Sequence, residues 1–148
     1  MKNILRVSLI IVLILLTVGC QMQPQKKTQS EGKQTQKPVE INSELAEKAK
    51  QAAMSVKGVE EATAVVIDKN ISTAIKVSGF NRLKLQSIKE EVHKKIGSMN
   101  EEYGVYVTAD KKLFAQLQQI EKQINEQKVK SGSELKQKVD KINKDMKG

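Results

Sequence analysis

A pair of β-rich stretches separated by a short polar segment constrains the fold more than any other feature of this sequence. The first stretch reads VEEATAVVID and the second reads ISTAIKVS, and both are rich in β-branched residues. One side of the second stretch would carry Ile71, Thr73, Ile75 and Val77. This period of two indicates a strand with one buried face, and the short connection at residues 68–70 predicts a β-hairpin. Phe80 is expected to pack at the end of that hairpin.

Apolar residues at spacings of three and four predict helices on either side of the hairpin. Before it, Asn42 or Ser43 is expected to cap a helix that ends at Gly58. The apolar stripe of this helix consists of Leu45, Ala49, Ala52 and Val56. After the hairpin, Asn81 is expected to cap a second helix, because the apolar residues that follow share one helical face. They are Leu85, Ile88, Val92, Ile96 and Met99.

A third strand and a third helix are expected after residue 100. The stretch YGVYVTAD alternates as a strand does, and Asp110 at its end is the predicted cap of a helix. The apolar face of that helix would consist of Leu113, Leu117, Ile120 and Ile124.

The same spacing returns near the C-terminus, after a polar segment at residues 131–133. The apolar positions there are Leu135, Val139, Ile142 and Met146. They predict an amphipathic helix, but the apolar stripe is only one residue wide, so the helix alone would be marginally stable. Docking on the core and pairing with another chain remain alternatives for this helix.

The predicted elements run in the order helix, strand, strand, helix, strand, helix over residues 41–127. Each has one apolar face, so the sequence predicts an α+β domain in which helices pack on one face of a small three-stranded sheet. Residues 128–148 would form a charged extension that contains the C-terminal amphipathic helix.

The chain begins with a segment typical of an export signal. Lys2 and Arg6 provide a positive start, and residues 7–18 are mostly aliphatic. This apolar run is shorter than the roughly 20 residues of a transmembrane helix, although an uncleaved anchor remains the alternative. Residues 20–40 are rich in Gln and Lys and contain almost no large apolar side chains, which predicts a disordered tether.

The only cysteine, Cys20, stands where the apolar run gives way to the tether. The residues LTVGC at positions 16–20 resemble a bacterial lipobox, although Thr17 departs from the aliphatic residue usual at its position. In lipobox proteins a lipid is attached to the cysteine thiol, and the peptide bond before the cysteine is then cut. The resemblance implies a lipoprotein signal peptide at residues 1–19 and a mature chain that is anchored by acyl chains, such as palmitate, at Cys20. The alternative is an incidental cysteine after an ordinary signal.

Two longer stretches resemble the YhcN/YlaJ-type sporulation lipoproteins of endospore-forming Gram-positive bacteria. They read AAMSVKGVEEATAVVIDKNISTAIKV and IKEEVHKKIGSMNEEYGVYVTADKKLFAQLQQI, within residues 43–120. The resemblance implies a lipoprotein on the extracytoplasmic face of the cell membrane, made during sporulation and retained in the spore, where the inner membrane is one location. Some members are linked to germination or outgrowth. The family carries no established catalytic residues, so the resemblance implies none in this chain.

The residues themselves offer little catalytic chemistry. His93 is the only histidine, and it lies among lysines on a predicted helix, where an exposed side chain is the simpler interpretation than a proton-transfer group. Adjacent helical residues diverge, so Glu90 and Glu91 do not converge on one ligand. The pairs at residues 60–61 and 101–102 would bind a hard cation only if the fold brought them together. We therefore expect no enzyme activity, no cofactor and no metal site.

The charge of the chain raises the question of its partners. The formal net charge is +9, and +7 remains without the first 19 residues, which favours anionic neighbours. Evenly solvated lysine faces are the plainer interpretation. A nucleic-acid partner is not expected, because aromatic residues to interleave with the lysines are scarce. The sequence leaves the oligomeric state open.

Two functional hypotheses follow. The first is a non-enzymatic binding or scaffold module, anchored to the membrane through lipidated Cys20, that acts with an envelope protein in sporulation or in spore germination and outgrowth. The second is an electrostatic binder of anionic envelope polymers or lipids without a spore-specific role. Strong salt dependence of binding would favour the second hypothesis.

Overall fold

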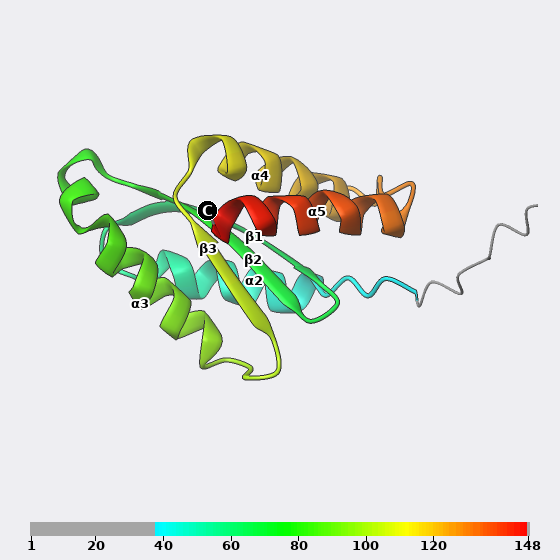
Figure 1. Cartoon of the computed structure of the whole chain (residues 1–148), viewed down its shortest axis with the longest axis horizontal. Coiled ribbons are helices and arrows are strands. Elements are labelled where there is room, and N and C mark those ends of the chain that lie inside the picture. Colours follow the sequence, from blue (N-terminus) through cyan, green and yellow to red (C-terminus); the bar gives the residue numbers. More distant parts are fainter. Residues whose placement is uncertain (1–37, 148) are drawn as a thin grey trace, which may run out of the picture. The chain divides into compact units, whose positions relative to one another are not determined.

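Figure 1 shows the computed structural model of the chain, which describes residues 38–147. The predicted signal peptide, Cys20 and the predicted tether as far as residue 37 lie outside the described residues. The described elements are α2 (Ser43–Met54), β1 (Val59–Ile67), β2 (Asn70–Val77), the 3-10 helix η1 (Gly79–Lys84), α3 (Leu85–Gly97), β3 (Gly104–Thr108), α4 (Lys111–Asn125) and α5 (Gly132–Lys147). The α+β class, the three-stranded sheet, the order of the elements and the C-terminal helix are therefore confirmed.

The strand β2 lies in the middle of the sheet, between β1 and β3. β1 and β2 form the predicted antiparallel hairpin, in which Ile67 pairs with Asn70 across a two-residue loop. Asp68 adopts a φ of 52° in this loop, a left-handed conformation that aspartate tolerates better than most residues. β3 runs parallel to β2, and α3 lies in the long connection that a parallel pair requires.

Helices cover both faces of this sheet (Figure 1), so the expectation that they pack on one face is corrected. α2 and α3 enclose one core cluster with Ala64, Val66 and Ile71 of the strands. α4 and α5 enclose a second cluster on the opposite face with Val65 and Ile67. Neighbouring strand residues point to opposite faces, and in β1 both sets are apolar, so both faces must be covered.

The strand β2 is likewise buried on both faces rather than on the one face that its alternation predicts. The side predicted to be polar carries Ser72 and Ala74, which are 0% exposed beneath the second helical layer. Both side chains are small, and the hydroxyl of Ser72 donates a hydrogen bond to Asn143 on α5. Because these side chains are small and the Ser72 hydroxyl has a hydrogen-bond partner, a helix can cover this face of the strand. The alternation of the sequence alone predicts that the same face is exposed to solvent.

The C-terminal helix α5, whose placement the sequence leaves open, packs against the sheet beside α4. Its buried residues are Leu135, Val139, Ile142 and Asn143. Lys136 lies 2.8 Å from Asp68 in the hairpin loop, which ties the start of the helix to the end of the sheet. At the first residue of α5, a Cβ added to Gly132 would lie 3.3 Å from the Cβ of Val39, so the incoming chain also packs here.

Two of the three predicted helix caps are confirmed. The side chain of Asn42 accepts a hydrogen bond of 2.9 Å from the Leu45 amide, and that of Asp110 accepts one of 2.8 Å from the Leu113 amide. Helix α2 ends at Met54, before the predicted stop at Gly58.

The expected cap at Asn81 was wrong, because Asn81 lies inside η1 and α3 begins only at Leu85. The Asn81 side chain instead donates a hydrogen bond of 2.7 Å to Ser78 Oγ. Phe80 does not pack at the end of the hairpin, since it is 99% exposed.

Candidate functional site

A partly buried ion pair joins α2 to α4 across the outer edge of β1. Glu121 on α4 has a side chain that is 14% exposed, and one of its carboxylate oxygens lies 2.7 Å from Lys50 Nζ on α2. Its other oxygen accepts a hydrogen bond of 2.6 Å from Thr63 Oγ1 on β1. The hydrogen bond to Glu121 is the main cause of a raised pKa of Lys50. Because one carboxylate oxygen pairs with Lys50 and the other with Thr63, Glu121 connects the two helical layers.

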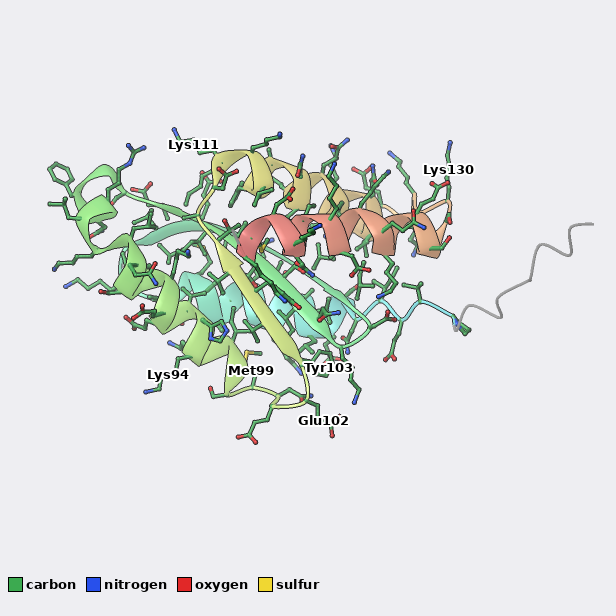
Figure 2. All side chains as sticks on the ribbon, in the orientation of Figure 1. Lys94, Met99, Glu102, Tyr103, Lys111 and Lys130 are labelled. Carbon is green, nitrogen blue, oxygen red and sulfur yellow. The ribbon has the colours of Figure 1, made fainter. Side chains whose placement is uncertain are left out.

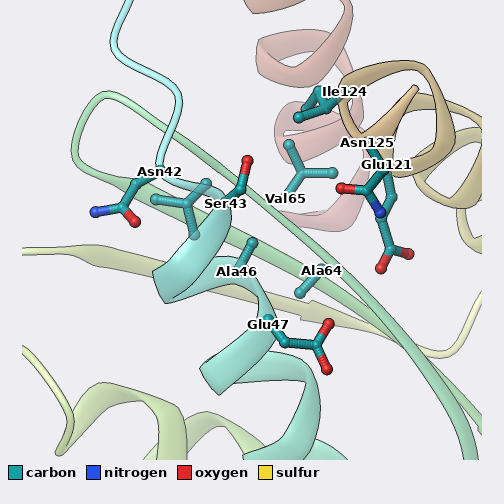
Figure 3. A pocket seen from close by; sticks show the side chains of 10 residues that line it. Asn42, Ser43, Ala46, Glu47, Ala64, Val65, Glu121, Ile124 and Asn125 are labelled. Atoms are coloured by element: carbon teal, nitrogen blue, oxygen red, sulfur yellow. The ribbon is translucent and has the colours of Figure 1, made fainter. Parts of the chain in front are cut away.

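A pocket of about 270 Å³ lies beside this ion pair, between the start of α2 and the end of α4 (Figure 3). Its apolar lining includes Ala46 and Ala64, and its polar lining includes Glu47 and Glu121. Lys50 Nζ lies 4.0 Å from Glu47 Oε2 as well as close to Glu121, so one ammonium serves both carboxylates. The pocket has room for a small polar molecule, but its charged groups already engage one another.

A second hollow of about 320 Å³ runs between the outward sides of α4 and α5, and we call it the α4–α5 groove. Its basic lining residues are Lys112, Lys138 and Lys141. Three glutamines supply neutral hydrogen-bonding groups from α4, and they are Gln116, Gln119 and Gln123. Among residues 38–147, Asp145 is the one acidic residue that lines it. Side-chain ammonium and amide groups together form a surface suited to phosphate or carboxylate groups.

The positive charge of the described domain is concentrated in this same layer. Residues 38–109 contain ten basic and ten acidic residues, whereas residues 110–147 contain ten lysines and six acidic residues. The excess of +4 therefore lies entirely in the segment that forms α4 and α5. Lys111 is the first residue of α4, and Lys130 lies just before α5. Both side chains project away from the sheet (Figure 2).

The structure leaves His93 on the surface, as the simpler interpretation of the sequence predicts. It is exposed on α3 and lines a shallow hollow of about 220 Å³ with Gln86, Lys89, Glu90 and Val107. The neighbouring carboxylate Glu90 accepts a hydrogen bond from Gln86 Nε2 at 2.9 Å.

The fold keeps apart the two acidic pairs that could have bound a cation only if they lay close together. Residues 60–61 lie at the start of β1, which pairs with the end of β2, whereas residues 101–102 precede β3, which pairs with the start of β2. Glu61 lies 2.7 Å from Lys76, and Glu102 lies 2.9 Å from Lys69. The hydrogen bond from Lys69 is the main cause of a lowered pKa of Glu102. Within residues 38–147 no group of three or more metal-binding side chains converges.

Cys20, the predicted lipidation site, lies outside the described residues, and its modification stays a prediction. The helices of the described domain do not combine the length and the hydropathy needed to cross a membrane.

Comparison with known proteins identifies the family. No curated protein matches the chain. The family model of the sporulation lipoprotein YhcN/YlaJ matches residues 17–147, which include Cys20, all described strands and all described helices. The matched segment also includes α5, so the C-terminal helix is part of the family domain. The chain therefore belongs to the YhcN/YlaJ family of sporulation lipoproteins.

Proposed function

We propose that this protein is a non-enzymatic binding module, held on the extracytoplasmic face of the membrane by acyl chains at Cys20 and active in sporulation or in spore germination. Membership of a sporulation lipoprotein family supports the membrane anchor and the stage of the life cycle. The sequence LTVGC at residues 16–20 supports Cys20 as the attachment point. Two acyl chains hold a protein on a bilayer far more firmly than one, because each buried methylene contributes about 0.8 kcal/mol.

The binding surface of this module is the α4–α5 groove, and its ligand is an anionic polymer of the envelope. The observation that carries this assignment is the confinement of the domain's net +4 charge to the segment that forms the groove. Lys112 projects into it from one helix, and Lys138 and Lys141 project from the other. A polymer with repeating phosphate or carboxylate groups would contact both helices at once, whereas evenly spread lysines would favour no particular face.

Binding to long-chain polyphosphate, measured with the full chain over a range of salt concentrations, tests the groove. Each phosphate contact with a single-stranded nucleic acid contributes about 0.7 to the slope of log K against log salt. With the same contribution per contact to polyphosphate, replacing Lys112, Lys138 and Lys141 by Gln should lower the magnitude of that slope by about 2. The matched control replaces Lys89, Lys94 and Lys95 on α3, which removes the same charge from another face. An equal loss in the control would show that net charge acts without a defined site.

Fractionation of growing cells and purified spores tests the anchor and the life-cycle stage. We expect the native chain in spore membranes and the Cys20→Ala chain outside them. Equal abundance in the membranes of growing cells would separate the function from spores. Membrane retention of Cys20→Ala would identify the N-terminal apolar segment as the anchor instead.

A further inference from the structure

Two large apolar side chains stand fully in solvent at one end of the domain. Phe80 is 99% exposed and Leu83 is 100% exposed, whereas the other exposed large apolar residues within 38–147, Met54 and Met99, are 43% and 37% exposed. Both belong to η1, which links β2 to α3. A 3-10 helix has three residues per turn, so side chains at positions i and i+3 project from the same side. Phe80 and Leu83 therefore form one protruding apolar pair, which we call the η1 tip.

The η1 tip rests on a constrained base. Asn81, between the two apolar residues, donates its backbone amide to the carbonyl of Ser78 at 3.0 Å and its side-chain amide to Ser78 Oγ at 2.7 Å. Gly58 lies next to Asn81 and has a φ of 104°. A Cβ added to Gly58 would lie 3.1 Å from Asn81 Nδ2 and 2.8 Å from Ile88 Cδ1. The turn before β1 thus packs closely against Asn81 and α3. Asn81 is engaged with the domain, while Phe80 and Leu83 are left in solvent.

Positive charges surround the η1 tip. Arg82 and Lys84 belong to η1 itself, and Lys57 precedes the glycine that packs against Asn81. Residues 78–89 contain no acidic residue. The nearest acids along the adjacent strand are Glu60 and Glu61, and Glu61 is paired with Lys76 at 2.7 Å. An exposed apolar pair framed by cations matches the chemistry of a bilayer surface, where anionic headgroups overlie hydrocarbon.

We propose that the η1 tip inserts Phe80 and Leu83 into an anionic lipid bilayer, so that the domain lies against the membrane instead of hanging free on its tether. A bilayer fits better than a protein groove, because the pair protrudes at full exposure and insertion needs no matching cavity. This inference rests on the lipid anchor of the proposed function, which keeps the domain within reach of the membrane surface.

The length of the chain permits both contacts at once. The seventeen residues between Cys20 and Pro38 can span up to about 60 Å when extended. The described chain enters α2 at one end of the domain and reaches Gly58 shortly after this helix ends. The twelve residues of α2 cover about 18 Å. The start of α2 and the segment between β2 and α3 lie toward opposite ends of the domain (Figure 1), and the length of α2, which runs between these ends, is well below the reach of the linking segment.

Tryptophan fluorescence of the full lipidated chain in vesicles tests the insertion. The sequence contains no tryptophan, so Phe80→Trp introduces a single probe into the tip. The vesicles contain phosphatidylglycerol and a phosphatidylcholine brominated on its acyl chains, because bromine quenches tryptophan only at short range. Lys130→Trp is the matched control, since Lys130 is exposed and lies in the connection between α4 and α5, at the far end of the domain from η1 (Figure 2).

We expect an emission maximum at shorter wavelength and strong bromine quenching for Phe80→Trp, and neither for Lys130→Trp. Adding Arg82→Gln and Lys84→Gln to the Phe80→Trp chain should reduce the quenching, and so should vesicles without phosphatidylglycerol. Equal quenching at both probe positions, or none at Phe80→Trp, would overturn the inference. A shift to shorter wavelength without bromine quenching, growing with protein density, would also overturn it, because the tip would then contact another chain.

Vesicle flotation separates this inference from the anchor. A chain that floats through its lipid but shows no quenching at Phe80→Trp retains the anchor and refutes the insertion. A lipidated chain that does not float refutes both.

Discussion

Two neighbouring hydroxyl residues of β2 should respond to substitution with opposite signs. Ser72 and Thr73 are both 0% exposed, and the pleat of the strand points them to opposite faces of the sheet. Ser72 Oγ donates a hydrogen bond of 2.6 Å to Asn143 Oδ1 on α5. On the other face, Thr73 Oγ1 has no hydrogen-bond partner within residues 38–147.

The expected magnitudes follow from these partners. Ser72→Ala leaves the Asn143 oxygen buried without its donor, which should lower the free energy of unfolding by about 1–3 kcal/mol. Thr73→Val keeps the shape of the side chain and removes a hydroxyl that is buried without compensation. This substitution should raise the free energy of unfolding by about 1 kcal/mol. The two variants should therefore differ in stability by about 2–4 kcal/mol.

Urea unfolding followed by far-ultraviolet circular dichroism measures both effects, in chains that all carry Cys20→Ser so that no lipid interferes. Each variant serves as the control of the other, since both remove one hydroxyl from the same strand. If Ser72→Ala were as stable as the parent, α5 would not be seated on β2. If Thr73→Val were destabilised by more than about 1 kcal/mol, the Thr73 hydroxyl would have a partner and the reasoning would fail.

Three further substitutions test particular contacts by the same unfolding measurement. Leu135→Ala, at a position 4% exposed on α5, should cost about 2–5 kcal/mol, while exposed Gln137→Ala should change little; equal small effects would mean that α5 is loosely attached. Gly58→Ala should cost about 1–3 kcal/mol, because the residue has a φ of 104° and its new Cβ would lie 2.8 Å from Ile88 Cδ1; an unchanged midpoint would contradict the close packing behind η1. Asp110→Ala should cost about 1 kcal/mol of stability, because it removes the cap to the Leu113 amide. Asp110→Asn should retain most of the capping stability, because its amide oxygen can accept the same hydrogen bond; equal losses in the two variants would show that the charge and not the hydrogen bond matters.

The elements were predictable because their signals are local. The alternation in residues 71–77, the spacing of apolar residues in each helix and the caps Asn42 and Asp110 all depend on near neighbours in the sequence. The failure at Asn81 has the same origin. An Asn before an apolar helical stripe is a usual cap, but here the backbone makes a 3-10 turn first and the side chain bonds to Ser78.

The candidate surfaces were harder to predict than the elements. The three lysines of the α4–α5 groove are separated by up to 29 positions in the sequence, and only the docking of α5 brings them together. The role of Glu121 was equally hidden, because its partners Lys50 and Thr63 come from distant elements. Phe80 was expected to be buried because it is aromatic, and nothing in its local sequence shows that the domain leaves it in solvent.

The sequence by itself determined the kinds of elements, their order, the family and the expected lipid attachment at Cys20. These properties follow from short-range periodicity and from a motif read along the chain. Only the tertiary structure decided that helices cover both faces of the sheet, that the acidic pairs lie apart, and that α5 belongs to the core. Each of these outcomes depends on which distant segments pack together, because burial is a property of contacts between elements and not of any one element alone.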